Sequence, residues 1–276
     1  MTRTFREGYM GMPPEDASRT QLTGLHSTQD AYGVKVDDTL NPVVNHYGDT
    51  VPIDDLLFWY DPNITSTISG STVKNAIDPN NSAQNGTWTS TPSTGTDSGK
   101  TYWDLTTHRL DVGPSNSYGF TTGTSNAFTV FTQVKRDSNT NSQWILFDYD
   151  GTYQGTSITD RGFFCHLWGD AKIYFDTNAN GSAYNRYYTS GVVSPNTWYT
   201  LILTQSGSSK AIYLNNSAQA VSTSNGTLNN LTLGSEKGVL GCAYGSSVDS
   251  KFTVFGAYNK VLNATERQAL HNAIRV

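Results

Sequence analysis

The chain has 276 residues, of which 15% are charged, and a formal net charge of −5. Lysine and arginine are scattered rather than clustered, which argues against a nucleic-acid partner and against binding to an anionic membrane. No apolar run reaches the roughly 20 residues of a membrane span, and the charged beginning lacks the apolar region of a secretory signal peptide. We therefore expect neither membrane insertion nor Sec-dependent export.

Residues 1–53 differ from the rest of the chain. All three methionines lie there, prolines are frequent, and apolar residues recur singly without a period of 2 or 3.6. Such a segment cannot build its own core, but isolated apolar side chains suit an extended arm that docks on another protein. The alternative is a tail that is disordered in isolation. The expected anchoring residues are Phe5, Tyr9, Met10 and Met12.

From residue 54 onward the pattern is that of many short strands. The first candidate, residues 56–60, is strongly apolar and is closed by Pro62. Later candidates are separated by Asn-Gly, Asp-Gly and proline-containing turns. This spacing predicts an all-β, two-sheet antiparallel sandwich over residues 54–276. The further candidates lie at residues 72–77, 86–89, 101–105, 127–135, 143–149, 162–168, 172–176, 183–189, 197–205, 210–214, 228–233, 239–243 and 251–258.

One helix is expected, at the C terminus. Residues 263–266 read Asn-Ala-Thr-Glu, a capping box, and Leu270 and Ile274 follow on one helical face. Trp198 begins an apolar alternating strand, which predicts a core position for its side chain.

The two cysteines, Cys165 and Cys242, are too few for a disulfide framework or a thiolate zinc site. We interpret both as buried apolar residues, and a single bridge between them is the alternative.

Residues 252–266 read FTVFGAYNKVLNATE, an apolar strand that runs into the helix cap. This stretch resembles the end of laminin-G-like domains of the concanavalin A-like lectin/glucanase superfamily. Residues 198–204 with 211–215 are similar to a strand pair of that family, and residues 57–61 are similar to its opening. The resemblance implies a jelly-roll sandwich. Residues 103–105, Trp-Asp-Leu, depart from the usual Phe-Asp/Asn-Gly, so that loop is expected to differ.

The N-terminal arm resembles, in composition, the anchoring extensions of bacteriophage virion proteins. This implies a virion structural protein, namely a capsid decoration, neck or tail component that is assembled in the host cytoplasm. The implied partners are the major capsid protein or a neck or tail protein, and further copies of the chain itself. The alternatives are a glycan-binding adhesin or receptor-binding tail protein on the same fold, and a glycoside hydrolase-like enzyme.

Glycoside hydrolysis requires two carboxylates that face the scissile bond. Of the four glutamates, two lie in the arm, Glu266 belongs to the capping box, and Glu236 lies in a glycine-flanked turn. Asp148 and Asp150 share a strand face, but they fit the exit of a hairpin with an Asp-Gly turn. No Gly-x-Ser-x-Gly nucleophile motif is present. The sequence therefore predicts that the protein is not an enzyme.

Glycan binding depends on aromatic faces that stack on sugars. The turn-rich segment at residues 151–194 concentrates such side chains, although tyrosine and tryptophan also favour strands for other reasons. The candidate glycan-facing residues are Tyr153, Trp168, Tyr184, Tyr187 and Tyr188.

Laminin-G-like domains often hold calcium at the sandwich rim, and this resemblance makes calcium the cofactor to consider. No EF-hand-like spacing or histidine pair supports a metal site, so we assign no cofactor and no metal ligand. The carboxylates available for calcium are Asp148, Asp150, Asp170 and Asp176.

Overall fold

A computed structural model of the chain describes residues 42–47, 51–105, 108–138, 143–148, 163–180, 183–224, 231, 233, 237–243 and 250–276. The chain divides into two compact units, Met1–Leu40 and Asn41–Val276, and all described residues belong to the second unit. The expected anchoring residues Phe5, Tyr9, Met10 and Met12 lie outside the described residues. None of the helices within the described ranges is long and apolar enough to cross a membrane.

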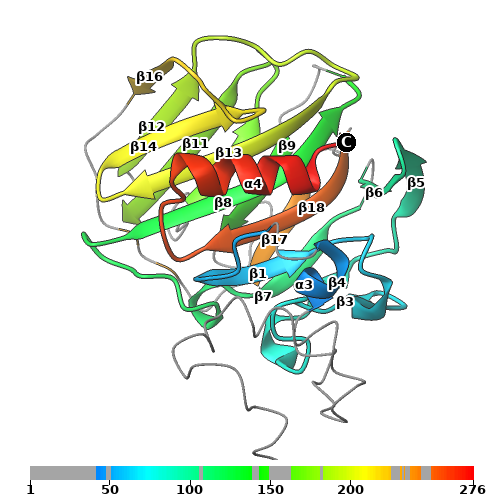
Figure 1. The fold of residues 1–276 in the computed structure, drawn as a ribbon. Helices are drawn as coiled ribbons and strands as arrows, with labels where there is room; N and C mark the ends of the chain where they lie inside the picture. Colours follow the sequence, from blue (N-terminus) through cyan, green and yellow to red (C-terminus); the bar gives the residue numbers. More distant parts are fainter. Residues whose placement is uncertain are drawn as a thin grey trace, which may run out of the picture. The chain divides into compact units, whose positions relative to one another are not determined.

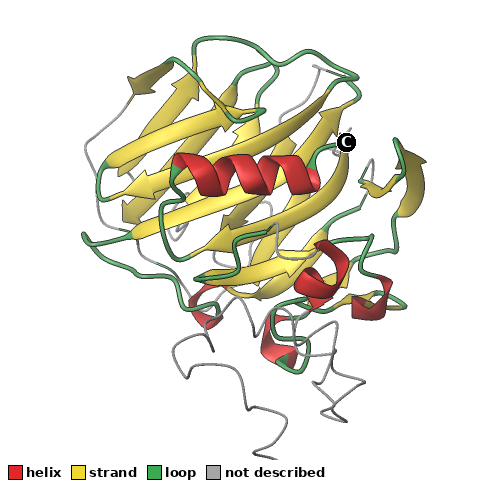
Figure 2. Cartoon of the chain, viewed as in Figure 1, coloured by secondary structure: helices red, strands yellow, loops and turns green. Residues whose placement is uncertain are grey.

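Two antiparallel sheets make up this second unit (Figures 1 and 2). The first sheet has the spatial order β15 (Ser217–Ala218), β14 (Ser209–Leu214), β13 (Trp198–Ser206), β8 (Ala127–Arg136), β18 (Ser250–Tyr258), β6 (Lys100–Asp104) and β5 (Ser93–Asp97), with β1 (Leu56–Tyr60) also paired to β18.

The second sheet has the order β16 (Val221–Ser224), β12 (Ala183–Thr189), β11 (Ile173–Asn180), β10 (Phe163–Leu167), β9 (Gln143–Asp148), β17 (Lys237–Ala243), β7 (Leu110–Pro114), β4 (Gly86–Trp88), β3 (Thr72–Val73) and β2 (Ile68–Ser69). Short 3₁₀ turns interrupt the connections, namely η3 (Thr65–Thr67), η4 (Ser82–Gln84) and η5 (Ser115–Ser117). These sheets confirm the all-β antiparallel fold that the strand spacing predicted.

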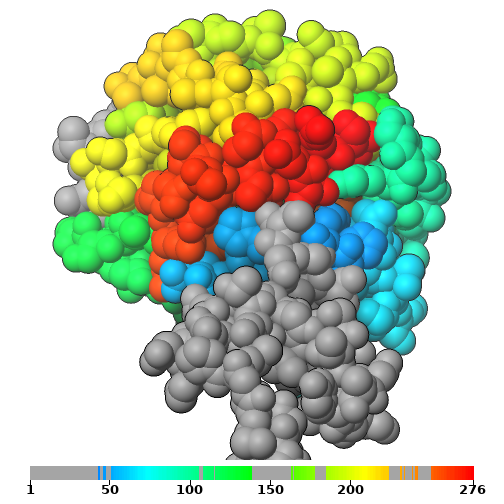
Figure 3. Space-filling model, in the orientation of Figure 1, coloured from blue at the N-terminus to red at the C-terminus, as the bar shows by residue number. Residues whose placement is uncertain are grey.

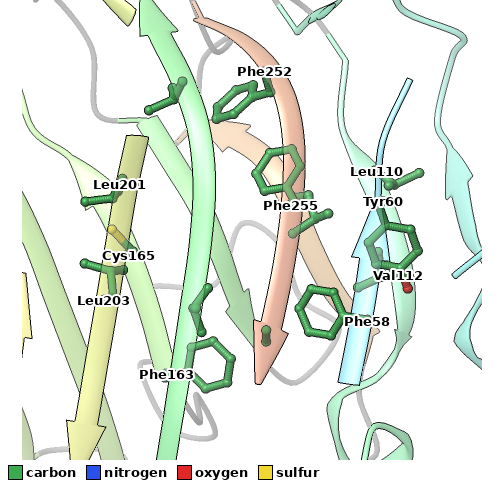
Figure 4. Close-up of a cluster of buried hydrophobic side chains, with 14 of the residues drawn as sticks. Phe58, Tyr60, Leu110, Val112, Phe163, Cys165, Leu201, Leu203, Phe252 and Phe255 are labelled. Carbon is green, nitrogen blue, oxygen red and sulfur yellow. The ribbon is translucent and has the colours of Figure 1, made fainter. Parts of the chain in front are cut away.

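The main core lies between the two sheets. Successive side chains of a strand point to opposite faces, so each strand contributes every second residue. In β13, for example, Leu201 and Leu203 enter this core while Ile202 points to the opposite face. Figure 4 shows the aromatic and aliphatic side chains that fill the space, among them Phe58, Tyr60, Leu110, Val112, Phe163, Cys165, Leu201, Leu203, Phe252 and Phe255.

A second core covers the outer face of the first sheet. The helix α4 (Ala264–Ile274) lies across this face and buries Leu270 and Ile274 against Ile202 and Val254 (Figures 1 and 3). The capping box is present, because the Asn263 side chain accepts hydrogen bonds from the amides of Thr265 and Glu266 at 2.9 and 3.0 Å. The expected C-terminal helix is therefore confirmed.

The end of the segment that the sequence assigned to the arm also packs here. The helix α3 (Pro42–Tyr47) buries Val43, and Val51 joins the same cluster beside Trp59. The Tyr47 hydroxyl donates a hydrogen bond to Asp61, a fully buried carboxylate that also accepts from the Trp59 indole at 3.1 Å. The helix α3 and Val51 therefore pack on the sandwich, and the arm that remains to be tested is residues 1–41.

The predicted core position of Trp198 is wrong. Alternation along the strand places Trp198 on the same face of β13 as Ile202, outside the main core, where it is half-buried. Its indole nitrogen donates to Asp97 at 2.8 Å, and the Lys135 ammonium lies 5.0 Å from the ring centroid.

A buried lysine bridges the two sheets at one end of the sandwich. Lys210 of β14 donates hydrogen bonds to the backbone oxygens of Phe175, at 3.2 Å, and of Asn185 on the second sheet. Its ammonium lies 4.6 Å from the Phe175 ring centroid and 5.7 Å from that of Tyr187. Desolvation lowers the pKa of Lys210 from its ordinary value of 10.5 to about 7.

Cys165 is a buried, unbridged thiol in the main core, as the sequence predicted. Burial, followed by the nearby Asp176 carboxylate, raises the pKa of Cys165 well above its ordinary value. Because Cys165 is free, the alternative of a bridge to Cys242 is wrong; the side chain of Cys242 lies outside the described residues.

Candidate binding face on the second sheet

Three rings stack across the outer face of β10, β11 and β12. His166 is paired directly with Tyr174, and Tyr174 with Tyr188, so the three side chains fall in one row. The His166 and Tyr174 rings are 4.9 Å apart and 6° from parallel, and the Tyr174 and Tyr188 rings are 5.3 Å apart and 18° from parallel. We call this row the aromatic ladder. Such cross-strand aromatic pairs stabilise the sheet locally.

Tyr174, in the middle of the ladder, has no free ring face. Tyr174 has a stacked neighbour on either side, His166 being buried and Tyr188 half-buried. A sugar that needs a free aromatic face therefore cannot stack on Tyr174. The ladder instead packs against the side chain of Trp168.

Trp168 lies at the turn between β10 and β11. Its backbone amide donates to Lys172 O at 3.1 Å, and Ala171, with a φ of +62°, closes the turn with a hydrogen bond to Trp168 O at 2.9 Å. The indole leans on the ladder, 5.3 Å from His166 and 6.2 Å from Tyr174 between centroids, at 58° and 59°. It nevertheless remains 46% exposed. The turn thus holds a large apolar surface in water.

A buried arginine holds the backbone of the turn through hydrogen bonds. Arg136, at the end of β8, donates to Trp168 O at 3.0 Å and to Ser138 O at 2.9 Å. The amide of Val193 donates to Ala171 O at 2.8 Å. These bonds hold the backbone of the turn and so fix the point from which the Trp168 side chain extends.

Charged groups beside Trp168 pair with one another. Asp170 accepts from the Tyr174 hydroxyl at 2.8 Å and from the amide of Lys172 at 3.1 Å. The Lys172 ammonium lies 3.9 Å from the same carboxylate and 5.3 Å from the Tyr188 ring centroid. Desolvation, and then the Asp170 carboxylate, raises the pKa of Tyr174 to about 12, so its hydroxyl keeps its proton at neutral pH.

A second ion pair lies farther along the same face. Arg186 of β12 donates to both oxygens of Asp176 on β11, with its closest contact at 2.7 Å, and its guanidinium lies 5.3 Å from the Tyr174 ring centroid. Asp176 is fully buried, so this pair fastens the two strands.

The candidate glycan-facing residues do not all lie on this face. It places Trp168 and Tyr188 on this face, while Tyr187 lies on the opposite face of β12, near Lys210. Tyr153 and the side chain of Tyr184 lie outside the described residues. Sequence reasoning missed Tyr174, although its spacing from Lys172 and Asp176 in an alternating strand indicated a shared face.

Two of the four carboxylates considered for calcium are already bonded here, Asp170 to Tyr174 and Asp176 to Arg186. Asp150 and the side chain of Asp148 lie outside the described residues. Within the described ranges no group of three or more histidine, cysteine, aspartate or glutamate side chains is placed to hold a metal ion.

Two facing antiparallel sheets, a packed C-terminal helix and an exposed aromatic turn define a lectin-like β-sandwich. A family profile described as the concanavalin A-like lectin/glucanases superfamily matches residues 97–266, which is more than half of the chain. The chain belongs to this superfamily. A search of curated protein sequences gave no match.

Several solved structures share the fold. The sialidase of Trypanosoma rangeli in complex with sialic acid aligns at 14% identity and a TM-score of 0.55, covering 80% of this chain and 33% of the sialidase. The binding domain of Paraclostridial Mosquitocidal Protein 1 aligns at 14% and 0.58, covering 79% and 52%. The receptor binding domain of botulinum neurotoxin C/D mosaic serotype aligns at 11% and 0.54, covering 79% and 51%. The chain thus spans a third to a half of these proteins.

These comparisons correct the prediction that the protein is not an enzyme. The sialidases contain the same sandwich fold. The shortage of paired carboxylates in the sequence therefore does not exclude an enzyme. At about 14% identity the likeness shows the fold alone and assigns no catalytic residue.

Proposed function

We propose that the protein binds carbohydrate through the face formed by Trp168 and the aromatic ladder. The observation that carries the proposal is Trp168, a large aromatic side chain held in solvent by a turn whose backbone is hydrogen-bonded on both sides. Aromatic side chains with a few polar neighbours are the usual means of holding a sugar ring. Asp170 and Lys172 supply those polar neighbours.

The fold comparisons support the proposal in general terms. The similar structures include a sialidase with bound sialic acid and a receptor binding domain. A cell-surface glycan is the ligand that such a face would meet.

Trp168→Ala is expected to weaken glycan binding at least tenfold, because a central aromatic contact is commonly worth 1.4 kcal/mol or about ten times in affinity. The measurement is binding of the purified full chain to a glycan array, followed by calorimetry with the best ligand. Val261→Ala is the matched control, since Val261 is also exposed, at 40%, but lies in the turn before α4. Equal affinity of the Trp168 variant and wild type would contradict the proposal.

We propose further that residues 1–41 anchor the protein to a larger assembly, with a bacteriophage virion as the assembly and location that the sequence favours. The isolated apolar residues of this segment support the proposal, since they suit insertion into pockets of a neighbouring capsid, neck or tail protein. Further copies of the chain are the other expected partners.

Deletion of residues 1–41 is expected to abolish incorporation into the parent particle and to leave the sandwich folded. The deletion ends before Val43, Tyr47 and Val51, which pack on the sandwich. Particle composition by mass spectrometry gives the first readout, and circular dichroism of the purified variant gives the second. Normal incorporation of the shortened protein would refute the anchoring role.

A further inference from the structure

We infer that the ligand of the Trp168 face is a neutral glycan rather than one that carries carboxylate or sulfate groups. This inference rests on the proposed carbohydrate-binding function and specifies its ligand class. It follows from the ion pairs and hydrogen bonds that the charged side chains around Trp168 already make.

The two arginines near Trp168 already donate hydrogen bonds to acceptors of the protein, which limits what they can offer an acidic sugar. Recognition of carboxylate or sulfate is strongest when a guanidinium presents two parallel donors. The Nε of Arg186 already bonds both oxygens of Asp176, and its Nη2 bonds one of them at 2.7 Å. Withdrawing Arg186 would leave the fully buried Asp176 without this partner, which is costly. Arg136 is itself buried and donates hydrogen bonds to the backbone oxygens of Trp168 and Ser138.

The lysine nearest to Trp168 is engaged as well. The Lys172 ammonium lies 3.9 Å from Asp170 and 5.3 Å from the Tyr188 ring centroid. Among the described side chains near Trp168, Lys172 and Arg186 therefore each have a carboxylate partner, and Arg136 is bonded to backbone oxygens.

Asp170 is the charged group best placed to meet a ligand. Its side chain is 39% exposed, and its two oxygens are oriented by the amide of Lys172 and the hydroxyl of Tyr174. An oriented carboxylate accepts hydrogen bonds from sugar hydroxyls and repels an acidic substituent. The net charge of −5 adds a long-range repulsion of the same sign. Trp168 would then hold the ring of the sugar and Asp170 would bind its hydroxyl groups.

The test uses immobilised oligosaccharides that end in galactose, glucose or N-acetylglucosamine, each beside its sialylated or sulfated counterpart. Wild type should bind one or more neutral members, and the acidic counterparts should bind at least about fivefold more weakly. Binding of the neutral ligand should change little between low and high salt, since no net charge is neutralised. Asp170→Asn should narrow the difference between the neutral and acidic members, and Trp168→Phe should retain more binding than Trp168→Ala.

Three outcomes overturn the inference in different ways. Trp168-dependent binding that prefers the acidic member would refute the neutral ligand class while supporting the carbohydrate-binding function. An Asp170→Asn variant with unchanged discrimination would also refute the role of Asp170. If Trp168→Ala changes binding to no glycan in the panel, the proposed function itself fails and the inference fails with it.

Discussion

Lys210→Met is expected to remove most of the increase in unfolding free energy that the wild-type protein shows between about pH 7 and pH 10. Lys210 is buried between the two sheets, where its amine bonds the backbone oxygens of Phe175 and Asn185. A neutral amine has two N–H groups, which match these two acceptors, whereas the ammonium adds a charge that burial penalises.

The direction of the effect follows from proton binding. Desolvation lowers the pKa of Lys210 to about 7 in the folded protein, against an ordinary 10.5 when unfolded, and the attraction of Asp176 offsets this only in part. Between these two values the unfolded chain holds the proton and the folded chain does not, so raising the pH favours folding. Each pKa unit of difference is worth about 1.4 kcal/mol, so the increase is on the order of several kcal/mol. Below about pH 7 both states are protonated and the contribution is constant.

Other groups around Lys210 do not reverse this direction. Arg186 lowers the pKa of Lys210 further, and Cys165 raises it slightly. At higher pH the buried Cys165 thiol and the buried tyrosines oppose it, because burial raises the pKa of Cys165, Tyr60 and Tyr258 and the unfolded chain releases their protons first. The stability maximum is therefore expected near pH 9 to 10, by the reference pKa values of lysine and tyrosine.

The measurement is urea unfolding at several pH values from 6.5 to about 9.5, for wild type, Lys210→Met and the half-buried control Lys74→Met. Wild type and the control should become more stable with rising pH, and Lys210→Met should show a nearly flat dependence. If the unfolding free energies of wild type and the Lys210 variant change equally with pH, Lys210 is not a neutral, buried amine in the folded protein.

Trp59→Ala is expected to destabilise the protein by about 3–5 kcal/mol, the range typical of removing a buried large aromatic side chain. Trp59 is fully buried in the second core, with ring centroids 5.2 Å from Tyr47 and 5.1 Å from Phe131. Its indole nitrogen also donates to the buried Asp61 at 3.1 Å, so the substitution removes one donor from a carboxylate that needs its partners.

Trp198→Ala is the matched comparison and should cost only about 1–2 kcal/mol. Trp198 is half-buried on the outer face, and its loss leaves Asp97 paired with Lys135 at 3.0 Å. Urea unfolding of both variants at pH 7 gives the two free energies. A loss at Trp198 as large as that at Trp59 would mean that the half-buried position contributes as much to stability as the fully buried one.

The sequence by itself determined the class of fold. Short apolar runs separated by Asn-Gly and proline turns specify strands, because these local preferences act before any long-range contact forms. The Asn263–Glu266 capping box likewise fixed the start of α4, since both of its hydrogen bonds lie within one helical turn. The same local motifs indicated the superfamily that residues 97–266 match.

Only the tertiary structure decided which face each strand residue occupies and what covers it. The alternation of apolar and polar residues in a strand does not say which side faces the core. The sequence therefore could not tell that Trp198 points outward or that Val43 and Val51 join the second core. The row of His166, Tyr174 and Tyr188 arises from the pairing register of three strands, which no single segment encodes. The same register stacks these rings against one another, and Trp168, just beyond the row, remains exposed to solvent.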